Sequence, residues 1–396
     1  MSQSTVRARV LVSPILMLVL LLASIGRVSA SSNCSWQVYM PPNLSGYQEL
    51  TAVDAIRAND VWAAGFYGTS SGEQRMAFEH FDGTQWSMVK APKNSLFTPY
   101  IFGLAHFASN DVWAVGVASD DPITMHWNGR VWKIVPNPAG SSGGILEAIV
   151  RVGNFMYAAG FVDPIQPLTL RFDGTQWVND NAYKPASGPS ILQAVAGTSP
   201  DDIWAGGYYN GGSPLTEKRD PKTNAWSQVP TSVGGYIDSM SARSSHEVWA
   251  VGPPDSSSGF VIRWNGKKWQ SVNYPRTGVA IEQVNATAST GDTWVAAFSD
   301  VGSAQFTAFV DFYVNGQWTE TPFVEVGNWS TVAWAISPVP GSSDLWAVGS
   351  YSNGNQFHQQ SLAELWSCTS AVHQATSVNL GTTRNGISRN SWRLRL

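Results

Sequence analysis

The sequence of 396 residues is 43% hydrophobic and only 13% charged, with 36 glycines and 19 tryptophans. This composition excludes a disordered, collagen-like or coiled-coil chain and favours a globular all-β protein with many turns. The formal net charge of −4 and the lack of a basic stripe in the repeats described below predict no nucleic-acid partner.

The start of the chain has the pattern of a signal peptide. Arg7 and Arg9 precede an apolar run over residues 10–26, and the small residues VSA at 28–30 form a cleavage site. We therefore expect residues 1–30 to be removed on export, which predicts an extracellular or secreted protein, with cell-surface association left open. A retained membrane anchor is the alternative, and no other stretch is apolar enough to span a bilayer.

A six-residue motif recurs along the rest of the chain. Its clearest copy, DVWAVG at residues 111–116, is rich in β-branched, aromatic and small residues and predicts a strand. Seven copies occur at spacings of 44 to 52 residues, centred on Trp62, Trp113, Tyr157, Trp204, Trp249, Trp294 and Trp346. Such a period, with four short strands per unit, is typical of a β-propeller blade. Residues 31–369 are therefore predicted to form an all-β, seven-bladed β-propeller with four-stranded antiparallel blades, and residues 370–396 a flexible, basic, Ser/Thr/Asn-rich tail.

Each unit contains four predicted strands in the same order. An inner strand, such as residues 49–53, precedes the motif strand, and a polar loop leads to a third strand that ends in an aromatic residue such as Trp127. A tight hairpin, such as Asn128-Gly129, opens a fourth strand that begins with a tryptophan such as Trp132. We expect the motif tryptophans to fill the gap between blades and the small residues after them to let neighbouring blades approach. A single blade cannot bury both faces, so the ring has to close.

The seventh unit lacks its fourth strand, and the start of the mature chain supplies a matching one. No fourth-strand tryptophan follows Trp366, whereas WQVYMPP at residues 36–42 resembles the fourth strands of complete units. We expect this segment to pair antiparallel to the third strand around residues 361–366. Cys34 and Cys368 flank the cut hairpin, which predicts a disulfide worth about 4–5 kcal/mol in the chain-entropy model. Two unrelated thiols are the alternative.

Two hairpin sequences resemble known propeller repeats. FDGTQW, at residues 81–86 and 172–177, resembles the end of the Asp-box of sialidase-like propellers, without its preceding serine. The fourth unit, with IWAGG at 203–207 and RDPKTNAW at 219–226, resembles the kelch repeat of galactose-oxidase-like propellers. The chain also resembles secreted bacterial proteins built of DVWAVG-type repeats. These resemblances imply the propeller fold, and a fold alone does not set a function.

The chemistry of these families does not carry over to matching residues. Galactose-oxidase-like enzymes use a cysteine cross-linked to a copper-binding tyrosine, and both cysteines here are assigned to ring closure. Sialidases use an arginine cluster, but Arg57, Arg151 and Arg243 lie at the inner-strand end that is expected to face away from the top-face site. His80 and His126 share one repeat position and are interpreted as framework. The sequence predicts no catalytic residue.

The candidate site residues are those that differ between units. The third residue of each inner strand is expected to line the channel near its mouth: Thr51, Phe102, Glu147, Gln193, Asp238, Glu282 and Thr331. The carboxylates favour a cation, with calcium as the candidate cofactor, or a polar ligand. A water-filled channel lining is the alternative. Loops around the same mouth carry four candidate ligand-binding tyrosines: Tyr67, Tyr208, Tyr209 and Tyr351.

Two functional hypotheses follow. The first is a secreted, monomeric, non-catalytic binding or scaffold propeller that recognises a glycan or protein ligand on its loop-rich top face. The second is a glycan-active hydrolase or lyase that uses the channel-mouth carboxylates, with or without a bound cation.

Overall fold

The structure is a computed structural model, in which 28 strands and no helix occupy the described residues. These are residues 33–44, 46–92, 98–186, 188–253, 259–287, 290–302, 305–321, 323–354 and 359–369. The expected signal peptide and tail lie outside the described residues. Nothing in the described ranges is a helix that could cross a membrane.

The strands form seven sheets of four strands each. The first blade contains β2 (Gln48–Arg57), β3 (Asp60–Gly68), β4 (Gln74–Phe81) and β5 (Trp86–Met88), and the second β6 (Tyr100–Ala108), β7 (Asp111–Ala118), β8 (Asp121–Trp127) and β9 (Trp132–Val135). The third contains β10 (Gly144–Val152), β11 (Phe155–Val162), β12 (Gln166–Phe172) and β13 (Trp177–Asn179), and the fourth β14 (Ser190–Ser199), β15 (Asp202–Tyr209), β16 (Ser213–Arg219) and β17 (Trp226–Gln228). The fifth contains β18 (Ser239–Ser244), β19 (Glu247–Gly252), β20 (Phe260–Trp264) and β21 (Trp269–Ser271), and the sixth β22 (Val279–Ala286), β23 (Thr293–Gly302), β24 (Gln305–Val314) and β25 (Gln317–Glu320). The seventh contains β26 (Ser330–Pro338), β27 (Leu345–Ser352), β28 (Gln359–Thr369) and β1 (Asn33–Val38).

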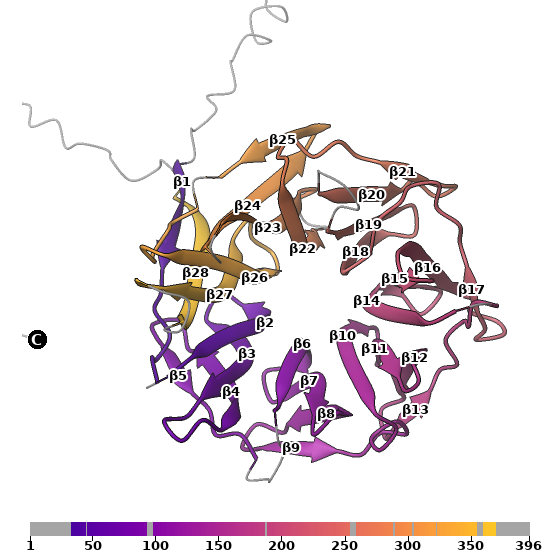
Figure 1. The fold of residues 1–396 in the computed structure, drawn as a ribbon, viewed down its shortest axis with the longest axis horizontal. Coiled ribbons are helices and arrows are strands. Elements are labelled where there is room, and N and C mark those ends of the chain that lie inside the picture. The colour runs from indigo at the N-terminus through magenta and orange to yellow at the C-terminus, as the bar shows by residue number, and fades with distance from the viewer. Residues whose placement is uncertain are drawn as a thin grey trace, which may run out of the picture. The chain divides into compact units, whose positions relative to one another are not determined.

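The seven blades stand in a ring that the first strand closes. Figure 1 shows the inner strands around a central opening, with indigo β1 beside yellow β28. The backbone N–H of Tyr39, just after β1, donates to the Ala363 carbonyl at 2.9 Å. Cys34 and Cys368, the two cysteines of the chain, are both disulfide-bonded. The predicted propeller, its closure by the N-terminal strand and the disulfide are therefore confirmed.

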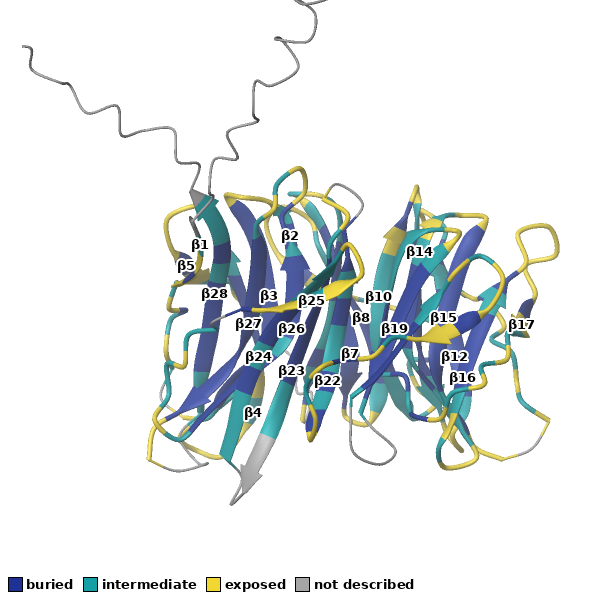
Figure 2. Ribbon diagram, turned by 90° about the horizontal axis from the view of Figure 1, so that it is seen from above, coloured by how far each residue is buried: buried dark blue, intermediate teal, exposed yellow. Residues whose placement is uncertain are grey.

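Aromatic side chains fill the interfaces between blades. The motif tryptophan of one blade meets the fourth-strand tryptophan of the next edge to face, with ring centroids 5.4 Å apart for Trp62–Trp132 and 5.3 Å apart for Trp346–Trp86. Seven clusters of buried side chains each join two neighbouring blades. Figure 2 shows that buried residues follow strands such as β3 and β27, while exposed ones gather in connections and on the outer strand β25. Each blade buries its two faces against its two neighbours, so all seven blades are fully packed only when the ring is closed.

Candidate functional site

Six of the seven inner strands carry one extra residue at the same place in the blade. The pairing with the second strand skips Thr51, Phe102, Glu147, Gln193, Glu282 and Trp334. In the fifth blade, Asp238 precedes β18 and bonds through its N–H to the Val251 carbonyl. A β-bulge turns the extra residue away from the ladder. All seven of these residues line one central cavity of about 720 Å³.

The glycine that ends the repeat motif exists because of this bulge. A Cβ on Gly160 would lie 1.9 Å from the Ile145 carbonyl oxygen, and one on Gly349 would lie 1.9 Å from that of Val332. In both cases the crowding atom belongs to the inner strand of the same blade, so these two glycines do not face a neighbouring blade. Glycine suits a place where two backbones come this close, and the sixth blade has Ala297 there, paired with Ile281. Gly206, by contrast, does let the next blade approach as expected, because a Cβ there would lie 2.5 Å from Met240 Sδ of the fifth blade.

Four consecutive blades, the third to the sixth, give the cavity an acidic wall. We call Glu147, Gln193, Asp238 and Glu282 the acidic arc; all four are half-buried. Burial raises the pKa of Glu147 and of Glu282 to about 7, and the nearby Asp238 adds to both shifts. Burial also raises the pKa of Asp238 to about 6, and a hydrogen bond from Gln193 opposes that rise. The buried Oε1 of Gln193 has no hydrogen-bond partner.

The opposite wall, from the seventh, first and second blades, is largely aromatic. We call Tyr47, Phe66, Tyr100, Phe102 and Trp334, all of which line the cavity, the aromatic arc. Successive ring centroids lie 5.6 Å apart for Tyr47–Phe66, 4.6 Å for Phe66–Tyr100 and 6.0 Å for Tyr100–Phe102. The indole Nε1 of Trp334 is buried without an acceptor. Sequence reasoning missed four members of this arc, Tyr47, Phe66, Tyr100 and Trp334, because they come from separate segments.

The prediction that Thr331 is the seventh lining residue is wrong. Thr331 is 1% exposed, pairs with Tyr351 on β27 and does not line the cavity. Trp334 occupies the bulge instead, because β26 begins farther before its bulge than the other inner strands do.

The four predicted tyrosines lie at the ends of second strands, on the face where the inner strands begin, which we call the entry face. Tyr351 is 7% exposed and donates to Gln360 Oε1 at 2.5 Å, so burial removes it from a ligand's reach. Tyr67, Tyr208 and Tyr209 are half-buried, and Tyr208 packs against Tyr236 with ring centroids 4.9 Å apart. None of the four is a lining residue of the cavity in the described part of the chain.

The geometry gives the expected calcium no ligand set. Among the described residues, no three or more His, Cys, Asp or Glu side chains are placed to hold a metal ion. The cavity wall of the described ranges contains five carboxylates, including Glu49 and Asp54, but no Lys, Arg or His. Glu49 accepts a hydrogen bond from the Tyr47 hydroxyl at 2.7 Å, and Asp54 contacts His106 at 2.7 Å. The acidic arc therefore holds the carboxylates that remain open to a ligand.

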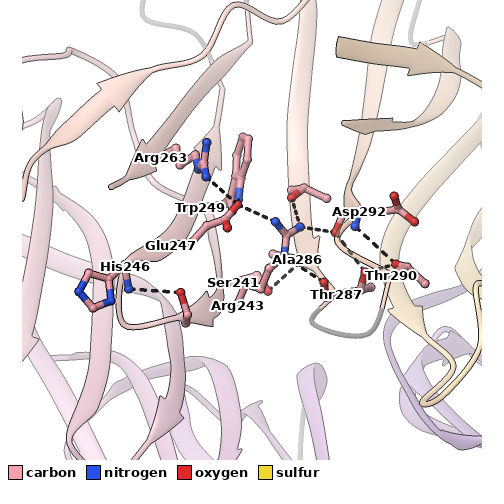
Figure 3. Close-up of polar contacts among 12 residues, drawn as sticks. Ser241, Arg243, His246, Glu247, Trp249, Arg263, Ala286, Thr287, Thr290 and Asp292 are labelled. Carbon is pink, nitrogen blue, oxygen red and sulfur yellow. Dashed lines mark hydrogen bonds and ion pairs between the residues drawn. The ribbon is translucent and has the colours of Figure 1, made fainter. Parts of the chain in front are cut away.

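The arginine at the far end of the fifth blade is a structural clamp. Arg243 contacts Glu247 at 2.6 Å and donates across the blade interface to the carbonyls of Thr287 and Asp292 and to Thr293 Oγ1, at 2.6 to 2.9 Å. Figure 3 shows the guanidinium enclosed by these groups. A guanidinium whose donors are used in this way holds two blades together and does not bind a substrate carboxylate.

The two repeated histidines also belong to the framework, as predicted. His80 lies 2.9 Å from Asp60, and His126 lies 2.8 Å from Asp111, the first residue of each motif. Asp111 also accepts from Trp113 Nε1 at 3.0 Å. The acid, tryptophan and histidine thus fix one another in place.

No family model and no curated protein matches this sequence. The chain is similar in fold to a solved structure of YCF48 bound to a D1 peptide, with 14% identity, a TM-score of 0.56 and coverage of 84% of this chain and 96% of that one. It is also similar to YCF48 from Cyanidioschyzon merolae, with 12% identity, a TM-score of 0.55 and coverage of 84% and 98%. At such identities the likeness shows the propeller fold alone, and the Asp-box and kelch resemblances stay predictions.

Proposed function

We propose that this protein is a non-catalytic binding propeller that receives a segment of a partner protein at the entry face of its central cavity. One observation carries the proposal. The residues repeated in every blade maintain the ring, whereas the seven residues at the bulge level vary among the blades and converge on one cavity. Variable side chains on a rigid scaffold are how propellers and other repeat folds present a binding surface. A structural neighbour described as bound to a peptide supports a protein ligand.

A peptide array probed with the purified, oxidised full chain tests this proposal. Thr51→Trp should abolish binding by filling the cavity, and Trp334 shows that the same bulge position accepts a tryptophan. Ser87→Trp, on the exposed face of the outer strand β5, is the matched control and should bind normally. Binding that survives Thr51→Trp, or an array without any bound peptide, would contradict a peptide-receiving cavity.

The proposal also includes a glycan as a possible ligand class and export of the protein. Aromatic rings beside polar acceptors also suit sugars, so a glycan array is probed in parallel with the same two variants. We propose that the protein acts outside the cytoplasm after cleavage behind Ala30. Sequencing the N-terminus of secreted material checks this, and a retained Met1 in that material would contradict it.

A glycan-active hydrolase remains the second candidate, and one observation favours it. Glu147, whose pKa burial raises to about 7, shares the cavity with Asp238, and an acid of raised pKa near a second carboxylate can act as a general acid. Turnover of a glycoside substrate that Glu147→Gln abolishes would establish this activity and end the binding-only proposal.

A further inference from the structure

The cavity has two chemically different walls on opposite sides of the ring. The acidic arc spans the third to sixth blades, and the aromatic arc spans the seventh, first and second. A ligand in this cavity touches both at once, so the two walls together define its chemistry.

The open polar groups of the acidic arc are acceptors. Glu147, Asp238 and Glu282 supply carboxylate oxygens, and Gln193 turns its amide donor to Asp238. No Lys, Arg or His among the described lining residues neutralises them. A group that satisfies this wall must donate hydrogen bonds and carry positive charge, because a half-buried carboxylate is stabilised most by a cation.

The aromatic arc adds an independent requirement. Four of its rings, Tyr47, Phe66, Tyr100 and Phe102, pack in succession along the cavity wall, which favours an apolar group or the stem of a long side chain. An anionic ligand would face the carboxylates, and a bare divalent ion would leave the aromatic wall unused.

We propose that the bound segment carries a lysine or arginine beside an aromatic or large aliphatic residue, with the cation on the acidic arc and the apolar neighbour on the aromatic arc. This inference rests on the proposed peptide-binding function. It assigns the four residues of the acidic arc as the specificity-determining groups.

Fluorescence anisotropy with two labelled octapeptides tests the inference on the oxidised full chain. One probe is Gly-Ser-Gly-Phe-Lys-Gly-Ser-Gly, and the other replaces lysine with the uncharged norleucine. The lysine peptide should bind at least tenfold more tightly. The triple variant Glu147→Gln, Asp238→Asn, Glu282→Gln should reduce this preference to less than twofold. A control outside the cavity, Glu73→Gln with Glu320→Gln, removes two exposed carboxylates and should keep the preference.

A variant that is expected to increase the lysine preference distinguishes a change at the site from a loss of folding. Gln193→Glu adds a carboxylate to the same wall and should increase the preference for lysine, which a misfolded protein cannot do. Equal affinity for both peptides in the unmodified protein, or a preference that survives the triple variant, would overturn the inference. If array peptides bind in the cavity but show no enrichment in basic residues, the cationic assignment fails while the peptide-binding function stands. If no peptide binds at all, both fail.

Discussion

Replacing Glu147 by glutamine should change how stability depends on pH. Because burial raises the pKa of this side chain from 4.5 to about 7, the folded protein holds a proton that the unfolded chain releases. Below pH 4.5 both states are protonated and the shift has no effect. Between pH 4.5 and about 7 the unfolded state ionises while the folded state keeps its proton, so the free energy of unfolding falls over this range and stays at the lower value above it. At 1.36 kcal/mol per pKa unit, the full cost is roughly 3 kcal/mol above pH 7.

Equilibrium urea unfolding from pH 4 to 8.5 measures this effect. The difference in the free energy of unfolding between Glu147→Gln and the unmodified protein should rise by about 2–3 kcal/mol over this range, in favour of the variant. Taking the difference removes the contributions of the other buried acids. Glu73→Gln, at an exposed ion pair, should give a flat difference curve within about 0.5 kcal/mol. A flat curve for Glu147→Gln as well would refute a carboxylate desolvated by the cavity wall.

Three further outcomes follow from the ring itself. Replacing Cys34 and Cys368 by serine should lower the thermal midpoint by an amount corresponding to at most about 5 kcal/mol, with an unchanged circular dichroism spectrum, because the strand pairing remains; a changed spectrum would contradict closure by pairing. Gly160→Ala should cost about 2 kcal/mol or more in urea unfolding, since its Cβ would meet a carbonyl oxygen at 1.9 Å; a neutral effect would refute the role of the bulge. Arg243→Met should cost about 3–5 kcal/mol, whereas Arg57→Met, whose side chain is 62% exposed, should cost less than about 1 kcal/mol; equal costs would refute the clamp.

The acidic arc could be predicted from the sequence, whereas its effect on the carboxylates could not. The repeat places Glu147, Asp238 and Glu282 at one position of the blade, and any closed ring brings equivalent positions together. Their raised pKa values depend on how much water the assembled cavity admits, which no single repeat encodes. In the same way, the tyrosine of the seventh blade that sequence reasoning assigned to the site, Tyr351, is buried by the tertiary packing.

The number of blades, the closing strand and the disulfide follow from the sequence, because each rests on a local pattern repeated at a fixed period. The tertiary structure was needed to place the seventh lining residue and the aromatic arc. A bulge adds one residue to one strand, and in a strand such a shift moves a side chain to the opposite face. Trp334 could therefore replace Thr331 at the cavity wall without any change in the repeat that identified the blade. The aromatic arc likewise depends on packing that one repeat does not encode, because it joins Tyr47 and Phe66 of the first blade to Tyr100 of the second.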